Sequence, residues 1–98
     1  MGTKPRFRPR NLGRKLLQIR NALGLSQSEM VRRLGADESI APARISEYEL
    51  GNREPALSTL LAYGRVARVH LETIVDDDLA LPDKIPSTFN YRRPKRRT

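Results

Sequence analysis

The sequence contains no cysteine and no run of five consecutive apolar residues. Without cysteine there is neither a disulfide scaffold nor a zinc site built on thiolates, and we expect an intracellular, cytoplasmic protein. The apolar runs are far shorter than the roughly 18–20 residues that a membrane span requires. No apolar stretch follows the basic residues at the start, so we expect no secretory signal there. We therefore expect no membrane partner.

Groups that carry catalysis are also scarce. His70 is the only histidine, and there is no glycine-rich phosphate loop. The carboxylates of Asp76–Asp78 are consecutive in the chain, and neighbouring carboxylates rarely converge on one cation. We predict that the chain is not an enzyme and that it binds no metal ion, cofactor or small-molecule substrate.

Positive charge is abundant, and it lies at the two ends of the chain. The 98 residues hold 19 Lys+Arg and 11 Asp+Glu, a formal net charge of +8; residues 1–10 carry +4, residues 81–98 carry +5 and the middle carries −1. Such an excess predicts a polyanionic partner. The basic residues that we assign to the two arms are Lys4, Arg6, Arg8, Arg10, Arg92, Arg93, Lys95, Arg96 and Arg97.

The same two ends contain most of the prolines and few core-forming residues. Such a composition buries too little apolar surface to offset the entropy that chain ordering costs. We therefore predict a flexible basic N-terminal arm over residues 1–10, a folded domain over 11–80 and a flexible basic C-terminal tail over 81–98.

Within the middle, apolar residues spaced four, three and four apart predict a first helix. These residues are Leu12, Leu16, Ile19 and Leu23, and Gly24 follows them as a helix terminator. Ser26 and Glu29 have the spacing of a capping box, which predicts that a second helix begins at residue 27. It extends to residue 34, and Gly35 ends it.

Three more helices follow. Pro42 suits a first helical position, so a third helix is expected over 42–50, with Ile45 and Tyr48 facing inward and Gly51 as its stop. A fourth is expected over about 56–68 and a short fifth near residues 71–75. The predicted inward stripe of the fourth helix is Leu57, Leu60, Leu61 and Val66. No alternating strand pattern occurs, so the predicted fold class is all-α, a compact five-helix bundle.

The middle of the chain contains several short motifs, in this order: Gly24-Leu25-Ser26-Gln27, Leu34-Gly35, Ile45-Ser46-x-Tyr48-Glu49, Gly51-x-Arg53-x-Pro55 and Leu60. Their order and spacing over about residues 12–79 resemble the phage repressor/Cro-type (lambda-repressor-like) helix-turn-helix family. The resemblance implies a sequence-specific regulator of transcription that binds double-stranded DNA. It further implies a repressor that works as a homodimer and is associated with the nucleoid in the cytoplasm.

The resemblance also implies that residues 42–50 form the recognition helix, which enters the major groove of DNA. The implied base-reading residues are Pro42, Ala43, Arg44 and Glu47. The guanidinium of Arg44 matches the O6 and N7 acceptors of guanine, although a phosphate contact or an ion pair with Glu47 is an alternative. For Glu47 there are two alternative roles: it accepts a hydrogen bond from cytosine N4, or it is an acidic residue that faces solvent.

Phosphate contacts and one internal ion pair complete the implied set. The phosphate-binding residues are Gln27, Ser28, Ser46 and Arg53, with a structural loop clamp as the alternative for Arg53. Arg20 and Glu49 correspond to positions that form a helix-to-helix ion pair in relatives. One departure from the family concerns the turn: nine residues separate Gly35 from Ile45, where relatives have about five. The insertion falls within residues 36–41 and predicts a longer turn.

Two other functions remain open on the sequence alone. One is an antitoxin-type protein that binds a toxin partner, or another protein, as well as its own promoter. The other is an RNA- or ribosome-associated adaptor, which would bind RNA and DNA equally and with a steep salt dependence.

Overall fold

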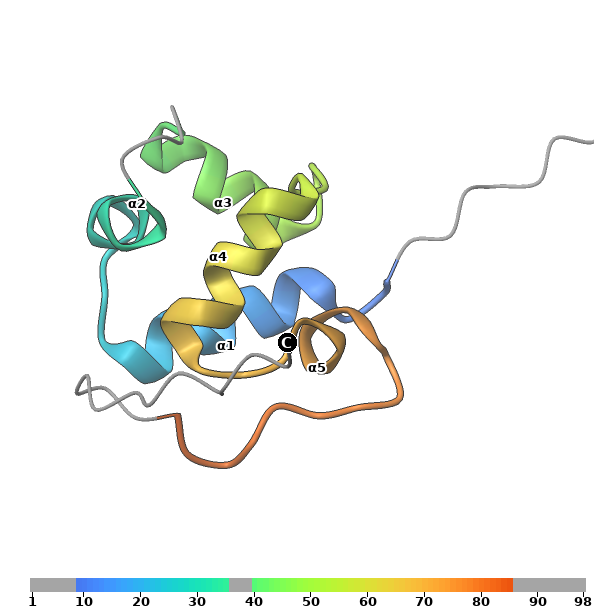
Figure 1. The fold of residues 1–98 in the computed structure, drawn as a ribbon. Coiled ribbons are helices and arrows are strands. Elements are labelled where there is room, and N and C mark those ends of the chain that lie inside the picture. Colours follow the sequence, from blue (N-terminus) through green and yellow to red (C-terminus); the bar gives the residue numbers. More distant parts are fainter. Residues whose placement is uncertain (1–8, 36–39, 86–98) are drawn as a thin grey trace, which may run out of the picture.

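The computed structural model describes residues 9–35 and 40–85, and its regular structure in these ranges is entirely helical. Helix α1 spans Leu12–Leu23, α2 Gln27–Leu34, α3 Pro42–Leu50, α4 Leu57–Ala67 and α5 Leu71–Val75 (Figure 1). The predicted all-α fold with five helices is therefore confirmed. The basic residues before Pro9 and after Ile85 lie outside the described residues, as do residues 36–39 of the long turn. None of the helices in the described ranges has the length and apolar character of a membrane-spanning helix.

The helix ends follow the local signals in the sequence. Ser26 Oγ accepts the backbone N–H of Glu29 at 3.1 Å, and Glu29 Oε1 accepts the backbone N–H of Ser26 at 2.8 Å, which completes the capping box of α2. Gly24 and Gly51 end α1 and α3 in the left-handed conformation, which glycine adopts without a Cβ clash. Pro42 occupies the first turn of α3, where its missing N–H leaves no hydrogen bond unmade.

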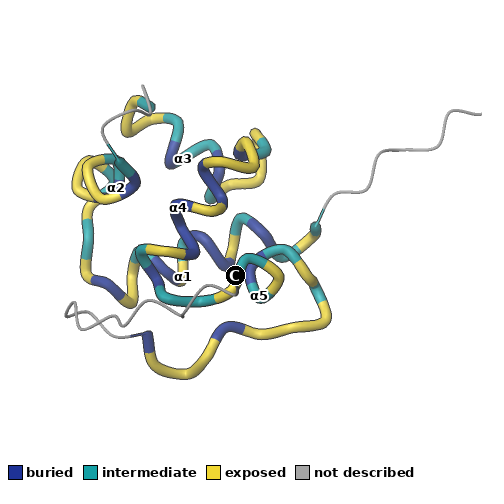
Figure 2. Tube along the Cα trace, in the orientation of Figure 1, coloured by how far each residue is buried: buried dark blue, intermediate teal, exposed yellow. Residues whose placement is uncertain are grey.

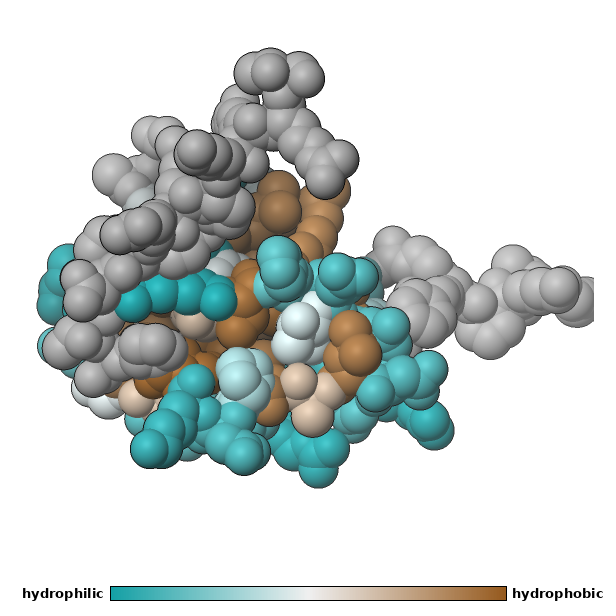
Figure 3. Space-filling model, turned by 60° about the horizontal axis from the view of Figure 1, so that its bottom comes forward, coloured by the Kyte–Doolittle hydropathy of each residue, from teal (hydrophilic) through white to brown (hydrophobic). Residues whose placement is uncertain are grey.

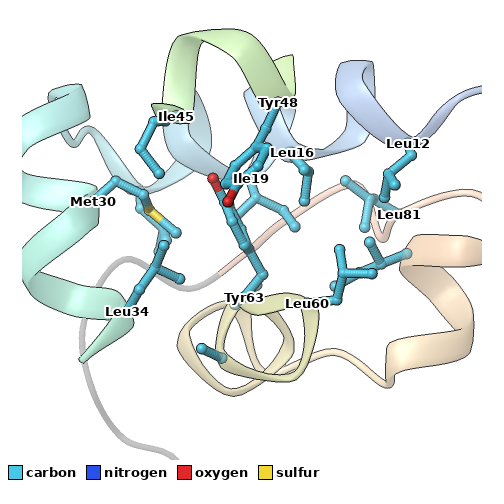
Figure 4. Packing of buried hydrophobic residues seen from close by; sticks show 14 of the residues in the cluster. Leu12, Leu16, Ile19, Met30, Leu34, Ile45, Tyr48, Leu60, Tyr63 and Leu81 are labelled. Carbon is cyan, nitrogen blue, oxygen red and sulfur yellow. The ribbon is translucent and has the colours of Figure 1, made fainter. Parts of the chain in front are cut away.

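One continuous core joins the helices. Helix α1 packs against α3, α4 and α5, and α2 packs against α3 and α4. The buried side chains of α1, α2, α3 and α4 meet between these helices (Figure 4), and the exposed residues lie on the outer surfaces (Figure 2). The fully buried apolar side chains at its centre include Leu16, Ile19, Met30, Ile45, Tyr63 and Ile74.

The inward face of α4 differs from the prediction. The predicted stripe was Leu57, Leu60, Leu61 and Val66. In the structure Leu60 is buried, but Leu57 is 64% exposed and Leu61 is 39% exposed. The buried face instead contains Thr59 and Tyr63. This helix is apolar on more than one side, so the periodicity alone did not determine which side meets the core.

The packed structure extends beyond residue 80, where the domain was expected to end. Leu81 and Ile85 are buried and belong to the core cluster. The segment that carries them follows α5 along the lower side of the domain in Figure 1, and Figure 3 shows that face with apolar surface set among hydrophilic residues. A non-helical segment can bury single apolar side chains without the periodicity that reveals a helix, which is why composition assigned it to the tail.

The start of α1 is capped by a residue from the other end of the domain. The carboxylate of Asp77 accepts the backbone N–H of Arg10 at 2.9 Å and that of Asn11 at 3.0 Å. Helix α1 has no side-chain cap of its own and no acidic residue in its first turn. Asp77 thus supplies the negative charge that favours a helix N-terminus.

A second contact links the same two parts of the chain. It is made by Lys15 of α1, whose side chain is buried although it is charged: the residue is only 5% exposed. Its Nζ donates to the backbone carbonyls of Thr73 and Asp76, both at 2.8 Å, at the C-terminal end of α5. A cation at this end of a helix satisfies carbonyls that lack a partner within the helix. Lys15 of α1 thus caps α5, and Asp77, two residues after α5, caps α1; together the contacts join the start of α1 to the end of α5.

Helix α1 also approaches α3 very closely at Gly13. A Cβ atom at this position would lie 2.8 Å from the carbonyl oxygens of both Tyr48 and Glu49. Such a contact is too short for any side chain, and the obstructing atoms are backbone. The absence of a side chain at Gly13 therefore sets how closely α3 is seated on α1.

The hydrogen bonds at Asp77 predict a specific dependence of stability on pH. The backbone N–H groups of Arg10 and then Asn11 lower the pKa of Asp77 below its ordinary value. Its stabilising contribution is therefore present above an unfolded-state pKa of about 4 and is lost as the pH falls through the lower folded value. We expect Asp77→Asn to lower the Tm at pH 7 and to reduce the loss of stability on acidification.

Thermal unfolding followed by circular dichroism between pH 7 and pH 2 measures both effects. Asp83→Asn removes the same charge from an exposed position nearby and should leave the curve nearly unchanged. Equal Tm losses in the two variants would show that Asp77 has no special role as a cap.

Candidate nucleic-acid interface

Helix α3 has one buried side and one polar side. Ile45 and Tyr48 face the core, as the sequence predicts. Pro42 and Ala43 are exposed at the start of the helix, and Ser46 is half-buried. The four residues predicted to read bases therefore come from the first six positions of one helix, and all four reach solvent.

The two charged members of that set contact each other. Arg44 Nε lies 3.0 Å from Glu47 Oε1 in an i,i+3 ion pair, and both side chains are 43% exposed. Arg53, in the loop after α3, reaches the same carboxylate oxygen with its Nε at 3.3 Å. The structure thus brings one predicted phosphate-binding residue together with two predicted base-reading residues. Two cations share one anion, which leaves this cluster with a net positive charge.

The other predicted phosphate-binding residues lie at the start of α2. Ser28 is exposed there and Gln27 is half-buried. The Gln27 side chain donates from Nε2 to Glu49 Oε1 at 3.4 Å, so the start of α2 lies beside the C-terminal part of α3. The exposed N–H groups of a helix start attract anions, which suits this end of α2 to a phosphate.

Arg20 and Glu49 form a bidentate salt bridge between α1 and α3. Arg20 Nε donates to Glu49 Oε2 at 2.6 Å and Nη2 donates to Oε1 at 3.0 Å. The side chains are 16% and 5% exposed, respectively. A third bond runs from Arg20 Nη1 to the carbonyl of Leu25 in the turn between α1 and α2, at 3.0 Å. The hydrogen bond to Glu49 raises the pKa of Arg20 above its ordinary value, against the effect of desolvation.

Tyr63 of α4 supports the same region from inside the core. Figure 4 shows its ring between the helices, with its hydroxyl beside Tyr48 of α3. Burial raises the pKa of Tyr63, and the nearby Glu49 raises it further. Tyr63, Gly13 and Lys15 were not among the residues predicted from the sequence. The helical step of three from Leu60 is the signal that could have identified Tyr63.

The acidic cluster Asp76–Asp78 has internal roles. Asp77 caps α1, and Asp76 Oδ1 accepts the backbone N–H of Asp78 at 2.9 Å. Across the described ranges, no group of three or more histidine, cysteine or carboxylate side chains is placed to hold a metal ion.

A comparison of the sequence with models of known protein families finds a match. The model of a family described as "Helix-turn-helix" matches residues 16–74, which include most of α1, all of α2, α3 and α4, and most of α5. No curated protein and no solved structure is significantly similar to the chain.

Removal of Glu49 is expected to be costly. Glu49→Ala would leave the Arg20 guanidinium largely buried without a counter-charge, and breaking such a pair from one side costs about 3 kcal/mol. The double variant Arg20→Met/Glu49→Leu replaces both charges with apolar groups and should lose less stability than the single variant.

Equilibrium unfolding in urea measures these free energies. Glu47→Ala is the matched control, because it removes a carboxylate of the same helix that forms two exposed ion pairs, each of which should contribute only about 0.2–1 kcal/mol. A loss at Glu49 no greater than that at Glu47 would rule out a stabilising role for the buried pair.

Proposed function

The chain belongs to the Cro/C1-type helix-turn-helix family, a family of DNA-binding regulators of transcription, and we propose that it is a repressor that binds double-stranded DNA sequence-specifically through α3. One observation carries the proposal. The salt bridge between Arg20 and Glu49 holds α3 to α1, while the outward face of its first six residues, which carries Arg44 and Glu47, reaches solvent. A rigidly held helix with an exposed polar face fits the major groove, which is wide enough for a helix and presents a distinct pattern for each base pair.

Within this proposal the two sets of residues have different tasks. Base readers select the sequence, and phosphate contacts fix the register of the protein on the duplex. The base readers are Pro42, Ala43 and Arg44, with Glu47 paired to Arg44 on the same face, and the phosphate contacts come from Gln27, Ser28, Ser46 and Arg53. The basic arms add affinity that does not depend on sequence.

We further propose that the chain acts as a homodimer on a two-fold symmetric operator. In helix-turn-helix dimers the half-sites lie about 34–36 Å apart, one turn of DNA. Leu50 at the end of α3 is 71% exposed and Leu57 at the start of α4 is 64% exposed. These two leucines flank the loop between α3 and α4, and we propose that they contribute to a protein contact beside the recognition helix.

Selection of bound sites from a random pool of double-stranded DNA tests the function directly. A two-fold symmetric consensus is the expected result. Equal binding to RNA and DNA without enrichment would favour the adaptor function, and stable capture of the product of an adjacent small toxin gene would add the antitoxin function.

Arg44→Ala should relax the preference at one base position in each half-site. Loss of a bidentate contact to guanine weakens binding by about 1–3 kcal/mol, and competition with operator variants measures the change position by position. If Arg44→Ala and the unaltered chain had the same base preference, Arg44 would not be a base-reading residue.

Deletion of residues 1–8 should weaken binding to all DNA sequences alike. It removes Lys4, Arg6 and Arg8 but keeps Arg10, whose backbone N–H is bonded to Asp77. Because each lost phosphate contact reduces the slope of log K against log salt by about 0.9, titration at several salt concentrations gives the number of contacts. A change in the preferred sequence would instead show that the arm reads the minor groove.

A further inference from the structure

We propose that Glu47 is a positioning residue that braces two arginines, Arg44 for a base and Arg53 for a phosphate, rather than a residue that reads DNA itself. The proposal rests on the proposed function, because it assumes that α3 binds in the major groove. It assigns to Glu47 a task that acts only through its two neighbours.

The geometry of the cluster carries the inference. Both arginines approach Glu47 with Nε, at 3.0 Å from Arg44 and 3.3 Å from Arg53, and both contact the same oxygen, Oε1. Arg53 is half exposed, and Arg44 and Glu47 are nearly so. One carboxylate oxygen therefore joins a side chain of the helix to a side chain of the following loop.

These contacts leave the terminal Nη groups of both arginines available to bind DNA. A guanidinium carries five N–H donors, and only one of them is on Nε. The ion pairs with Glu47 use the Nε side of each group. The terminal Nη groups remain, and they form a fork that matches the O6 and N7 acceptors of guanine or two phosphate oxygens.

A brace of this kind improves recognition by ordering the arginines in advance. A long arginine side chain loses rotamer freedom when it binds, and fixing it beforehand reduces this loss. The charges are consistent with such a role. An unpaired carboxylate in this position would repel the phosphates, whereas one shared by two guanidiniums leaves a net positive cluster.

Base selection by variants at Glu47 distinguishes a brace from a reader. In Glu47→Ala the preference should fall at the operator position that Arg44→Ala also relaxes, by about fivefold or more. Glu47→Gln keeps an oxygen that accepts from Nε and should retain part of the preference. The double variant Arg44→Ala/Glu47→Ala should lose nothing further at that position, because Glu47 acts there through Arg44.

Glu72→Ala is the matched control, because it removes an exposed carboxylate from α5, on the opposite side of the domain from α3 in Figure 1. A second readout needs no DNA. The Nε–H signals of Arg44 and Arg53 in the nuclear magnetic resonance spectrum should shift in Glu47→Ala and stay in place in Glu72→Ala. A cooperative thermal transition above the temperature of the binding assay would show that all these variants are folded.

Three results would overturn the brace while the proposed function stands. They are a relaxed preference at a position that Arg44→Ala does not affect, an unchanged consensus in Glu47→Ala, and unshifted Nε–H signals. If the unaltered chain selects no consensus at all, the proposed function fails and the brace fails with it.

Discussion

The arrangement of the first three helices depends on the carboxylate of Glu49. Arg20 binds both of its oxygens from α1, and Gln27 reaches one of them from the start of α2. Arg20 in turn holds the carbonyl of Leu25 in the turn between the two helices. A charge that is only 5% exposed is stable only when it is paired and hydrogen-bonded, so the three helices can adopt few alternative arrangements without leaving it unsatisfied. Gly13 completes this constraint, because it lets α1 come close enough for the pair to form.

The residues of α3 consequently divide into two groups that do not compete. Ile45, Tyr48 and Glu49 attach the helix to the domain, and the remaining polar positions of its first six residues are left for a ligand. The exposed ion pairs of Glu47 contribute less to the stability of the fold than the buried pair does, so the position of the helix does not depend on them. Stability and recognition are thus assigned to opposite sides of a helix of nine residues.

The sequence predicted best where a local signal has one structural meaning. The capping box at Ser26 and the glycines after α1 and α3 determined the helix ends correctly, because these features depend on neighbouring residues alone. It failed where the answer depends on distant parts of the chain. Leu57 was predicted as a core residue because its helix is apolar on several sides. No local signal indicates the burial of Lys15, because its partners are carbonyls some 60 positions away. The contact of Glu47 with Arg44 follows from their spacing, but that with Arg53 required the path of the loop.

The mutual caps of α1 and α5 have a consequence for how the domain opens. A helix of five residues is too short to persist by itself, so α5 exists only while it is docked. Its docking is also what holds the first turn of α1, through Asp77, so neither end can fray independently of the other. We therefore expect the start of α1 and α5 to behave as one cooperative unit, with the backbone amides at both places exchanging with solvent through the same opening event.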